Sequence, residues 1–84
     1  MTLSEQSLTI RSRKDLAAFV LSLRKDFQDG GHAWENNTLD LFLGALAAWV
    51  DDMEGYYRNR GEAVPDCPDW KTMADMLMAA RSYE

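Results

Sequence analysis

The sequence predicts an all-α fold in which three helices, at about residues 13–29, 38–60 and 68–83, pack into one compact domain. Apolar residues recur at three- and four-residue spacing in each range, as on the buried face of a helix. Glycines at 30, 31 and 61 and prolines at 65 and 68 separate the ranges. The chain has 84 residues, which suits a single small domain spanning residues 1–84.

The composition is that of a globular protein with a thin core. Hydrophobic residues make up 46% and charged residues 27% of the chain, which is too apolar for a disordered protein. The lone cysteine, Cys67, excludes an internal disulfide, and there is no Cys/His cluster for structural zinc. Because so short a domain buries only about 60% of its unfolded surface, we expect close helix packing or self-association to stabilise it.

The charge is negative and unevenly distributed. The formal net charge is −5, and residues 31–84 hold ten acidic against four basic side chains. Phosphate backbones and anionic lipids repel such a chain, so we expect neither nucleic acid nor a membrane as partner. The longest uncharged apolar run, Leu41–Val50, is about half the ~20 residues of a membrane span. Without a signal-peptide core and with a single thiol, the expected location is the cytoplasm.

The polar residues 1–11 show no helical period and predict either a brief extended segment or a frayed tail. In the first helix, Ser12 and Asp15 have the spacing of a capping box, and Gly30-Gly31 ends the helix because glycine enters the left-handed conformation easily. The predicted buried face of this helix consists of Leu16, Phe19, Val20, Leu23 and Phe27.

The second helix is the longest, and we expect it to be central. Asn37 is its predicted cap, with Asp40 in the first turn. We expect it to continue past Gly55, because Glu54 and Arg58 have the favourable i,i+4 spacing, and to stop at Gly61. It carries two apolar stripes, which predict two neighbouring helices. These stripes are Leu39, Phe42, Leu46, Trp49, Val50 and Met53, and beside them Leu41, Ala45 and Ala48.

The third helix follows a turn-rich linker at residues 62–69. Pro68 suits the first helical turn, where a missing N–H costs nothing, so either Asp66 or Cys67 is the expected cap. The predicted buried face consists of Trp70, Met73, Ala74, Leu77, Ala80 and Tyr83.

No residue pattern predicts catalysis, a cofactor or a metal. His32 has no nucleophile or carboxylate motif beside it, so it is read as an ordinary loop residue. Cys67 lies between an aspartate and a proline, neither of which favours a thiolate. Adjacent helical residues point about 100° apart, so Asp51 and Asp52 cannot chelate one ion together. We therefore expect a non-catalytic protein.

Aromatic and charged residues near the end of the second helix predict a binding surface. Trp49 is expected in the core, and Trp34 and Trp70 at its ends. Because neighbours on a helix cannot both face inward, Tyr56 or Tyr57 should meet solvent, beside arginines typical of interface hot spots. The predicted partner surface consists of Asp51, Asp52, Glu54, Tyr56, Tyr57, Arg58, Arg60 and Trp70.

Several short motifs support a resemblance to a known family. They are Trp34-Glu-Asn36, Thr38-Leu39 with Phe42-Leu43, Ala48-Trp49, Asp52-Met-Glu-Gly-Tyr-Tyr57, Asn59-Arg-Gly61, Pro68-Asp-Trp-Lys71, Ala74-Asp-Met-Leu77 and Ala79-Ala-Arg-Ser-Tyr-Glu84. The chain resembles a family of small uncharacterised bacterial helical domains, over residues 34–84 closely and over the first helix more loosely. The resemblance implies a compact helical protein with no assigned activity and no catalytic residues to carry over.

Three functional hypotheses follow. The first is a cytoplasmic protein-interaction module whose partner is basic, with an immunity-type inhibitor of a basic toxin or nuclease as its sharper form. The second is a small-ligand binder or enzyme with an aromatic and acidic pocket among Trp34, Tyr56 and Trp70, with His32 or a carboxylate inside it. The third is a purely structural homodimer that buries spare apolar surface.

Overall fold

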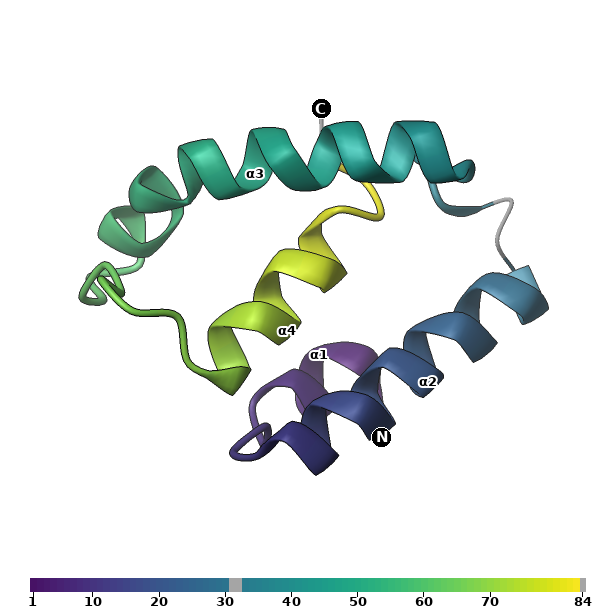
Figure 1. The fold of residues 1–84 in the computed structure, drawn as a ribbon, viewed down its shortest axis with the longest axis horizontal. Coiled ribbons are helices and arrows are strands. Elements are labelled where there is room, and N and C mark those ends of the chain that lie inside the picture. The colour runs from purple at the N-terminus through teal and green to yellow at the C-terminus, as the bar shows by residue number, and fades with distance from the viewer. Residues whose placement is uncertain (31–32, 84) are drawn as a thin grey trace.

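A computed structural model describes residues 1–30 and 33–83 and confirms the all-α class (Figure 1). The described residues form four helices and no strand: α1 (Leu3–Ser7), α2 (Arg13–Gly30), α3 (Leu39–Asn59) and α4 (Trp70–Ala79). Three of them correspond to the predicted helices, and α1 is additional.

The prediction of an extended or frayed N-terminus was wrong, because residues 3–7 form the short helix α1. Thr2 and Glu5 make a reciprocal capping box: the Glu5 N–H donates to Thr2 Oγ1 and the Thr2 N–H donates to Glu5 Oε1, both at 3.1 Å. The backbone hydrogen bond from Thr2 lowers the pKa of Glu5. The Thr-x-x-Glu spacing of Thr2 and Glu5 indicates the start of a helix. It was not used in the prediction because residues 1–11 lack an apolar helical period.

Helix α2 begins as predicted and ends one residue later, at Gly30. The Asp15 N–H donates to Ser12 Oγ at 3.1 Å, as in a capping box. The Asp15 side chain, which is shorter than the glutamate of a full capping box, accepts the Arg11 N–H at 3.0 Å instead of the N–H of the cap residue Ser12. Gly31, the second residue of the predicted stop, lies outside the described residues.

Helix α3 is capped by Thr38, so the prediction of Asn37 was wrong by one position. Thr38 Oγ1 accepts the Leu41 N–H at 3.2 Å. The helix does continue through Gly55 and ends at Asn59, and Gly61, with φ +70°, follows the cap residue Arg60 as the predicted stop. There the Gly61 N–H donates to the Arg58 carbonyl (3.0 Å) and the Glu62 N–H to the Tyr57 carbonyl (2.9 Å), which is a Schellman motif.

Helix α4 begins at Trp70, two residues later than predicted, and ends at Ala79 rather than near 83. Asp69 is the cap, so both Asp66 and Cys67 were wrong. Its Oδ1 accepts the Thr72 N–H (2.8 Å) and the Thr72 hydroxyl (2.7 Å), and the hydroxyl bond is the main cause of its lowered pKa. Asp69, two residues after Cys67, thus satisfies the first N–H groups of α4 in place of the predicted caps.

The centre of the fold is α4. The prediction from the sequence that α3 would be central was wrong. Helix α4 packs against α1, α2 and α3, whereas α3 packs against α4 alone among the described helices. Figure 1 shows α4 between α3 and α2, with α1 beside α2. The fully buried Ala74 and Ala80 explain this arrangement, because small side chains let neighbours approach α4 closely.

The main core cluster joins α2, α4 and the N-terminal segment. Ile10, Phe19, Leu23 and Ala74 are buried in it, and Leu3, Leu16, Trp34, Leu77 and Met78 pack against them. Trp49 is buried as predicted. Val20, Phe27, Trp70 and Met73 were predicted on buried faces but remain substantially exposed. The helical period was correct, but the faces are only partly covered.

Replacing Gly61 by alanine should destabilise the protein by about 1 kcal/mol, because a Cβ is strained at positive φ. Gly55→Ala is the matched control: it lies inside α3 with open space at its Cβ position, and should stabilise by about 0.5–1 kcal/mol. Urea unfolding measures both. Equal effects of the two changes would contradict the assigned end of α3.

Candidate functional site

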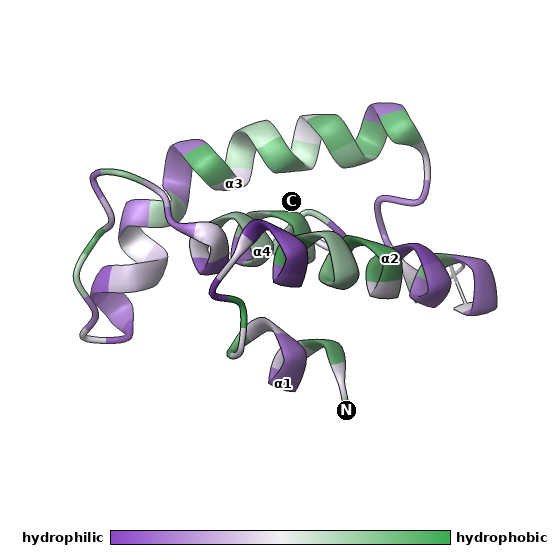
Figure 2. Ribbon diagram, turned by 60° about the horizontal axis from the view of Figure 1, so that its bottom comes forward, coloured by the Kyte–Doolittle hydropathy of each residue, from purple (hydrophilic) through white to green (hydrophobic). Residues whose placement is uncertain are grey.

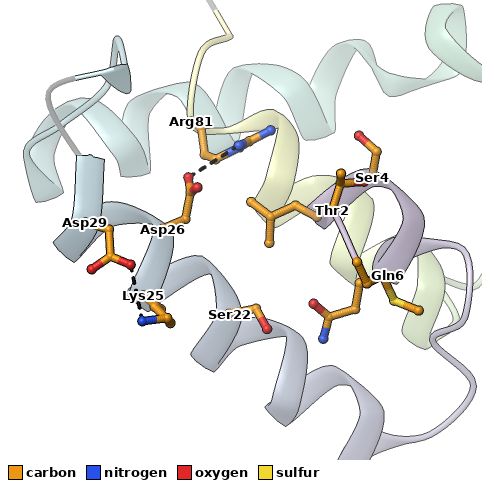
Figure 3. A pocket seen from close by; sticks show the side chains of 10 residues that line it. Thr2, Ser4, Gln6, Ser22, Lys25, Asp26, Asp29 and Arg81 are labelled. Carbon is orange, nitrogen blue, oxygen red and sulfur yellow. Dashed lines mark ion pairs between the residues drawn. The ribbon is translucent and has the colours of Figure 1, made fainter.

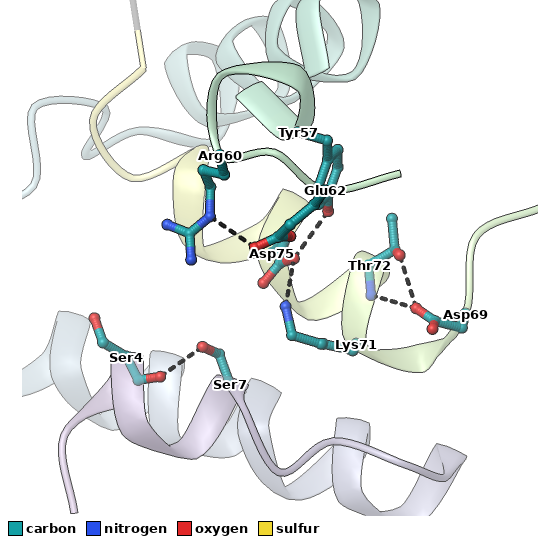
Figure 4. Close-up of polar contacts among 9 residues, drawn as sticks. All are labelled: Ser4, Ser7, Tyr57, Arg60, Glu62, Asp69, Lys71, Thr72 and Asp75. Atoms are coloured by element: carbon teal, nitrogen blue, oxygen red, sulfur yellow. Dashed lines mark hydrogen bonds and ion pairs between the residues drawn. The ribbon is translucent and has the colours of Figure 1, made fainter. Parts of the chain in front are cut away.

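Tyr57, one of the predicted partner-surface residues, belongs to the core. Its side chain is 4% exposed and its hydroxyl donates to Asp75 Oδ2 at 2.8 Å, while Lys71 Nζ lies 3.0 Å from the same oxygen (Figure 4). Burial, then the bond to Asp75, raises the pKa of the Tyr57 hydroxyl far above its usual value. This contact joins α3 to α4 and leaves Tyr57 unavailable to a partner.

Tyr56 is the member of the pair that reaches solvent, as the helical geometry required. Its ring packs on Trp49 at 5.3 Å and on Tyr57 at 5.0 Å between centroids. The Arg60 guanidinium lies 5.3 Å from the Tyr56 ring centroid. One exposed aromatic with a cation above it is a modest contact surface.

Several charged residues of the predicted surface have partners, either within this surface or next to it. Glu54 pairs with Arg58 along α3, and Arg60 pairs with Glu62 at 3.0 Å. Asp52 accepts a hydrogen bond from the Tyr83 hydroxyl, which raises the pKa of Tyr83. Such exposed pairs add little to the stability of the fold. They do mean that few charged side chains near the C-terminal end of α3 lack a partner.

Trp70 lies at the first residue of α4, half-exposed, and has no ring contact with the α3 tip among the described residues. The predicted pocket among Trp34, Tyr56 and Trp70 is not formed either. Trp34 lines a groove with α2 and α3, and Tyr56 lines a separate cavity with Trp49 and Asp75. His32, which was the alternative to a carboxylate inside that pocket, lies outside the described residues.

A polar latch holds the C-terminal turn to the connection between α2 and α3. The Asn36 side-chain amide donates to the carbonyls of Ala80 (3.0 Å) and Tyr83 (2.9 Å), and its backbone N–H donates to the Arg81 carbonyl (3.0 Å). The bond from Tyr83 to Asp52 extends the latch to α3. Asp52 therefore has a structural partner.

An exposed apolar surface lies on the first two-thirds of α3, and it includes residues of a stripe that the sequence predicted to face a neighbouring helix. Leu39, Leu43 and Val50 are 74%, 52% and 40% exposed. With the half-buried Leu46 they follow the 4-3-4 spacing of one helical line, the pattern by which one helix receives another. We call Leu39, Leu43, Leu46 and Val50 the α3 stripe. Figure 2 shows how apolar this part of α3 is compared with its C-terminal end.

An acidic row borders the α3 stripe. Asp40, Asp51 and Glu54 are exposed and, by their spacing, lie along the adjacent line of the helix. Among the described residues, no ion pair forms at Asp40 or Asp51, whereas Glu54 is paired with Arg58. The outer side of α3 therefore combines an uncovered apolar line with negative charge.

An aromatic groove adjoins the stripe between the end of α2 and the start of α3. The Trp34 ring lies 5.2 Å from Phe27, edge to face, and 6.0 Å from Phe42, nearly parallel. Its indole N–H donates to Asp26 Oδ2 at 2.7 Å, which fixes the orientation of the ring. The groove has a volume of about 290 Å³, and Leu39 and Arg24 complete its walls.

A larger cavity than the groove, about 570 Å³, lies between α1 and the polar side of α2 (Figure 3). Its charged groups are already paired: Lys25 with Asp29 at 3.2 Å, and Arg81 with Asp26 at 3.6 Å. An open, polar cavity with paired charges gives no preference for a ligand.

Other chemistry finds no support in the described residues. No three His, Cys, Asp or Glu side chains gather there as they would around a metal ion. Cys67 is exposed. None of the described helices has both the length and the apolarity needed to cross a bilayer.

Residues 12–84 match the model of a family of unknown function, DUF7660. The chain belongs to this family. No curated protein and no solved structure matches it. The match covers α2, α3 and α4 and leaves out α1, and it confirms the expectation of an uncharacterised domain family.

In this DUF7660 member, Tyr57→Phe should lower the free energy of unfolding at pH 8 by about 1–3 kcal/mol, because Asp75 loses a buried donor. Since the pKa of Tyr57 is raised in the folded state, this contribution is complete below pH 10 and is lost as the pH rises above it. At pH 11 the two proteins should differ by about 1 kcal/mol less.

Urea unfolding at both pH values tests this, with Tyr56→Phe as control on the neighbouring, exposed ring. A constant difference between Tyr57→Phe and wild type from pH 8 to pH 11 would contradict the buried hydrogen bond.

Asn36→Asp should open the C-terminal latch, because a carboxylate cannot donate to the Ala80 and Tyr83 carbonyls. We expect a loss of about 1–3 kcal/mol and faster hydrogen exchange at residues 80–83. Asn37→Asp, one residue on and exposed, should leave exchange there unchanged. Unaltered protection in Asn36→Asp would show that the latch does not hold this turn.

Proposed function

We propose that this protein is a non-catalytic, acidic protein-interaction module that binds a basic amphipathic segment on the outer side of α3. An immunity-type inhibitor of a basic toxin or nuclease is one form of this function, and a cytoplasmic setting is consistent with it. The observation that carries the proposal is the exposed α3 stripe bordered by Asp40, Asp51 and Glu54. The proposed contact surface therefore lies along α3 rather than at its tip.

The amount of exposed surface supports the proposal. The accessible surface is 5788 Å², whereas a monomeric protein of 9.6 kDa exposes about 5,100 Å². The excess, about 700 Å², is close to the ~800 Å² that each protein buries in a standard interface. Helix α3 contributes to this excess because it packs on α4 alone among the described helices.

Charge favours a basic partner over a second copy of this chain. A partner helix seated on the stripe must run beside the acidic row, where lysine or arginine gains from complementarity. A second copy would bring the same three acids near their equivalents, and like charges at an interface are unfavourable. The net charge of −5 adds long-range steering of a basic partner.

The test compares Leu43→Asp with Leu21→Asp, an equal change at an exposed leucine of α2. We expect tagged wild type and Leu21→Asp to capture the same basic protein from a native lysate at low salt, and Leu43→Asp to lose it. Both variants become more acidic, so charge alone cannot explain a loss specific to Leu43. With the purified partner, the association rate should fall as salt is added. Capture that is indifferent to Leu43→Asp, or an association rate indifferent to salt, would refute the proposal.

A further inference from the structure

The aromatic groove has room for one large amino-acid side chain. Its volume of about 290 Å³ is at the lower end of the ~300–1,000 Å³ typical of small-molecule sites. Phe27, Trp34 and Phe42 line it with rings, and the contacts among these rings hold them in place before any ligand arrives. A preformed apolar groove of this size receives one large side chain at little cost in ordering.

The groove is continuous with the α3 stripe. Leu39 is both the first residue of the stripe and part of the groove wall. A helix that lies along Leu43 and Val50 therefore passes the mouth of the groove at one end.

We propose that the groove is the anchor site for the partner: it takes one bulky apolar side chain, aromatic or leucine, from the end of the same basic segment. This inference rests on the proposed function and adds to it the position and chemistry of the anchor. Buried aromatic anchors in such pockets dominate the binding energy of many interfaces.

The charges around the groove orient the partner. Arg24 lines the groove and forms no ion pair among the described residues, so a basic residue beside the anchor would be repelled. Asp51 and Glu54 lie toward the other end of the stripe. The partner segment accordingly carries its apolar anchor at one end and its basic residues toward the other.

The experiment uses the full chain and two synthetic 18-residue amphipathic peptides. Each peptide has leucine at heptad a and d positions and lysine beside them; the first has phenylalanine at both ends, so that either direction of binding is allowed, and the second has alanine there. Calorimetry at low salt measures both dissociation constants. We expect the phenylalanine peptide to bind about tenfold more tightly or better, and Phe27→Ala to abolish that advantage.

Variants and a spectroscopic signal separate the groove from the stripe. Leu43→Asp should weaken both peptides, whereas Leu21→Asp should weaken neither. In NMR spectra of wild type, the Trp34 indole N–H signal should shift with the phenylalanine peptide and not with the alanine peptide, while that of buried Trp49 stays in place. This signal decides the question even if Phe27→Ala fails to fold.

Each contrary result has its own meaning. Equal affinities for the two peptides, with no shift at Trp34, would overturn the anchor site and leave the proposed function standing. Failure of both peptides to bind wild type, or binding indifferent to Leu43→Asp, would overturn both. A wild-type dimer in sedimentation that Leu43→Asp dissociates would identify a second copy as the occupant and would also overturn the anchor site.

Discussion

The hydrogen bond between Tyr57 and Asp75 is the contact on which the placement of α3 depends. Asp75 is 5% exposed, and a carboxylate so deeply buried is stable only with donors around it. Tyr57 supplies one donor from α3 and Lys71 the other from α4 itself. Because α3 packs on α4 alone among the described helices, this bond holds the C-terminal end of α3 against the helix that carries it. Earlier in α3, Trp49 is buried while the α3 stripe remains exposed.

Local signals in the sequence were sufficient for the elements but not for their arrangement. Apolar spacing and glycine positions located α2 and α3 to within one or two residues, because caps and stops act over a single turn. The central position of α4 could not be predicted this way. Periodicity identifies an apolar face, but it does not say which neighbour covers that face or whether any neighbour does. The long α3 looked central because it carries two apolar stripes, although part of its apolar surface is uncovered.

The candidate site was predicted in part, for a similar reason. The sequence indicated correctly that one of two adjacent tyrosines must reach solvent, but not which one. Asp75 resembles any surface carboxylate until its buried partner from α3 is known, so neither it nor the core role of Tyr57 was expected. The groove was missed because Phe27 and Phe42 were both assigned to buried faces. They are 15 positions apart in the chain, and only the course of the connection through Trp34 brings them together.

The uncovered side of α3 also bears on how the protein is stabilised. Among the described residues, the fully buried side chains are few and mostly small, and phenylalanine at 19 is the only large one below 2% exposure. A domain of this size has a small margin of stability. A segment that covers the stripe and fills the groove removes apolar surface from water, and any partner that binds only the folded state stabilises it by mass action. Recognition and folding are then linked through the same residues. No described helix covers the α3 stripe, so this apolar line is the surface on which a partner binds favourably.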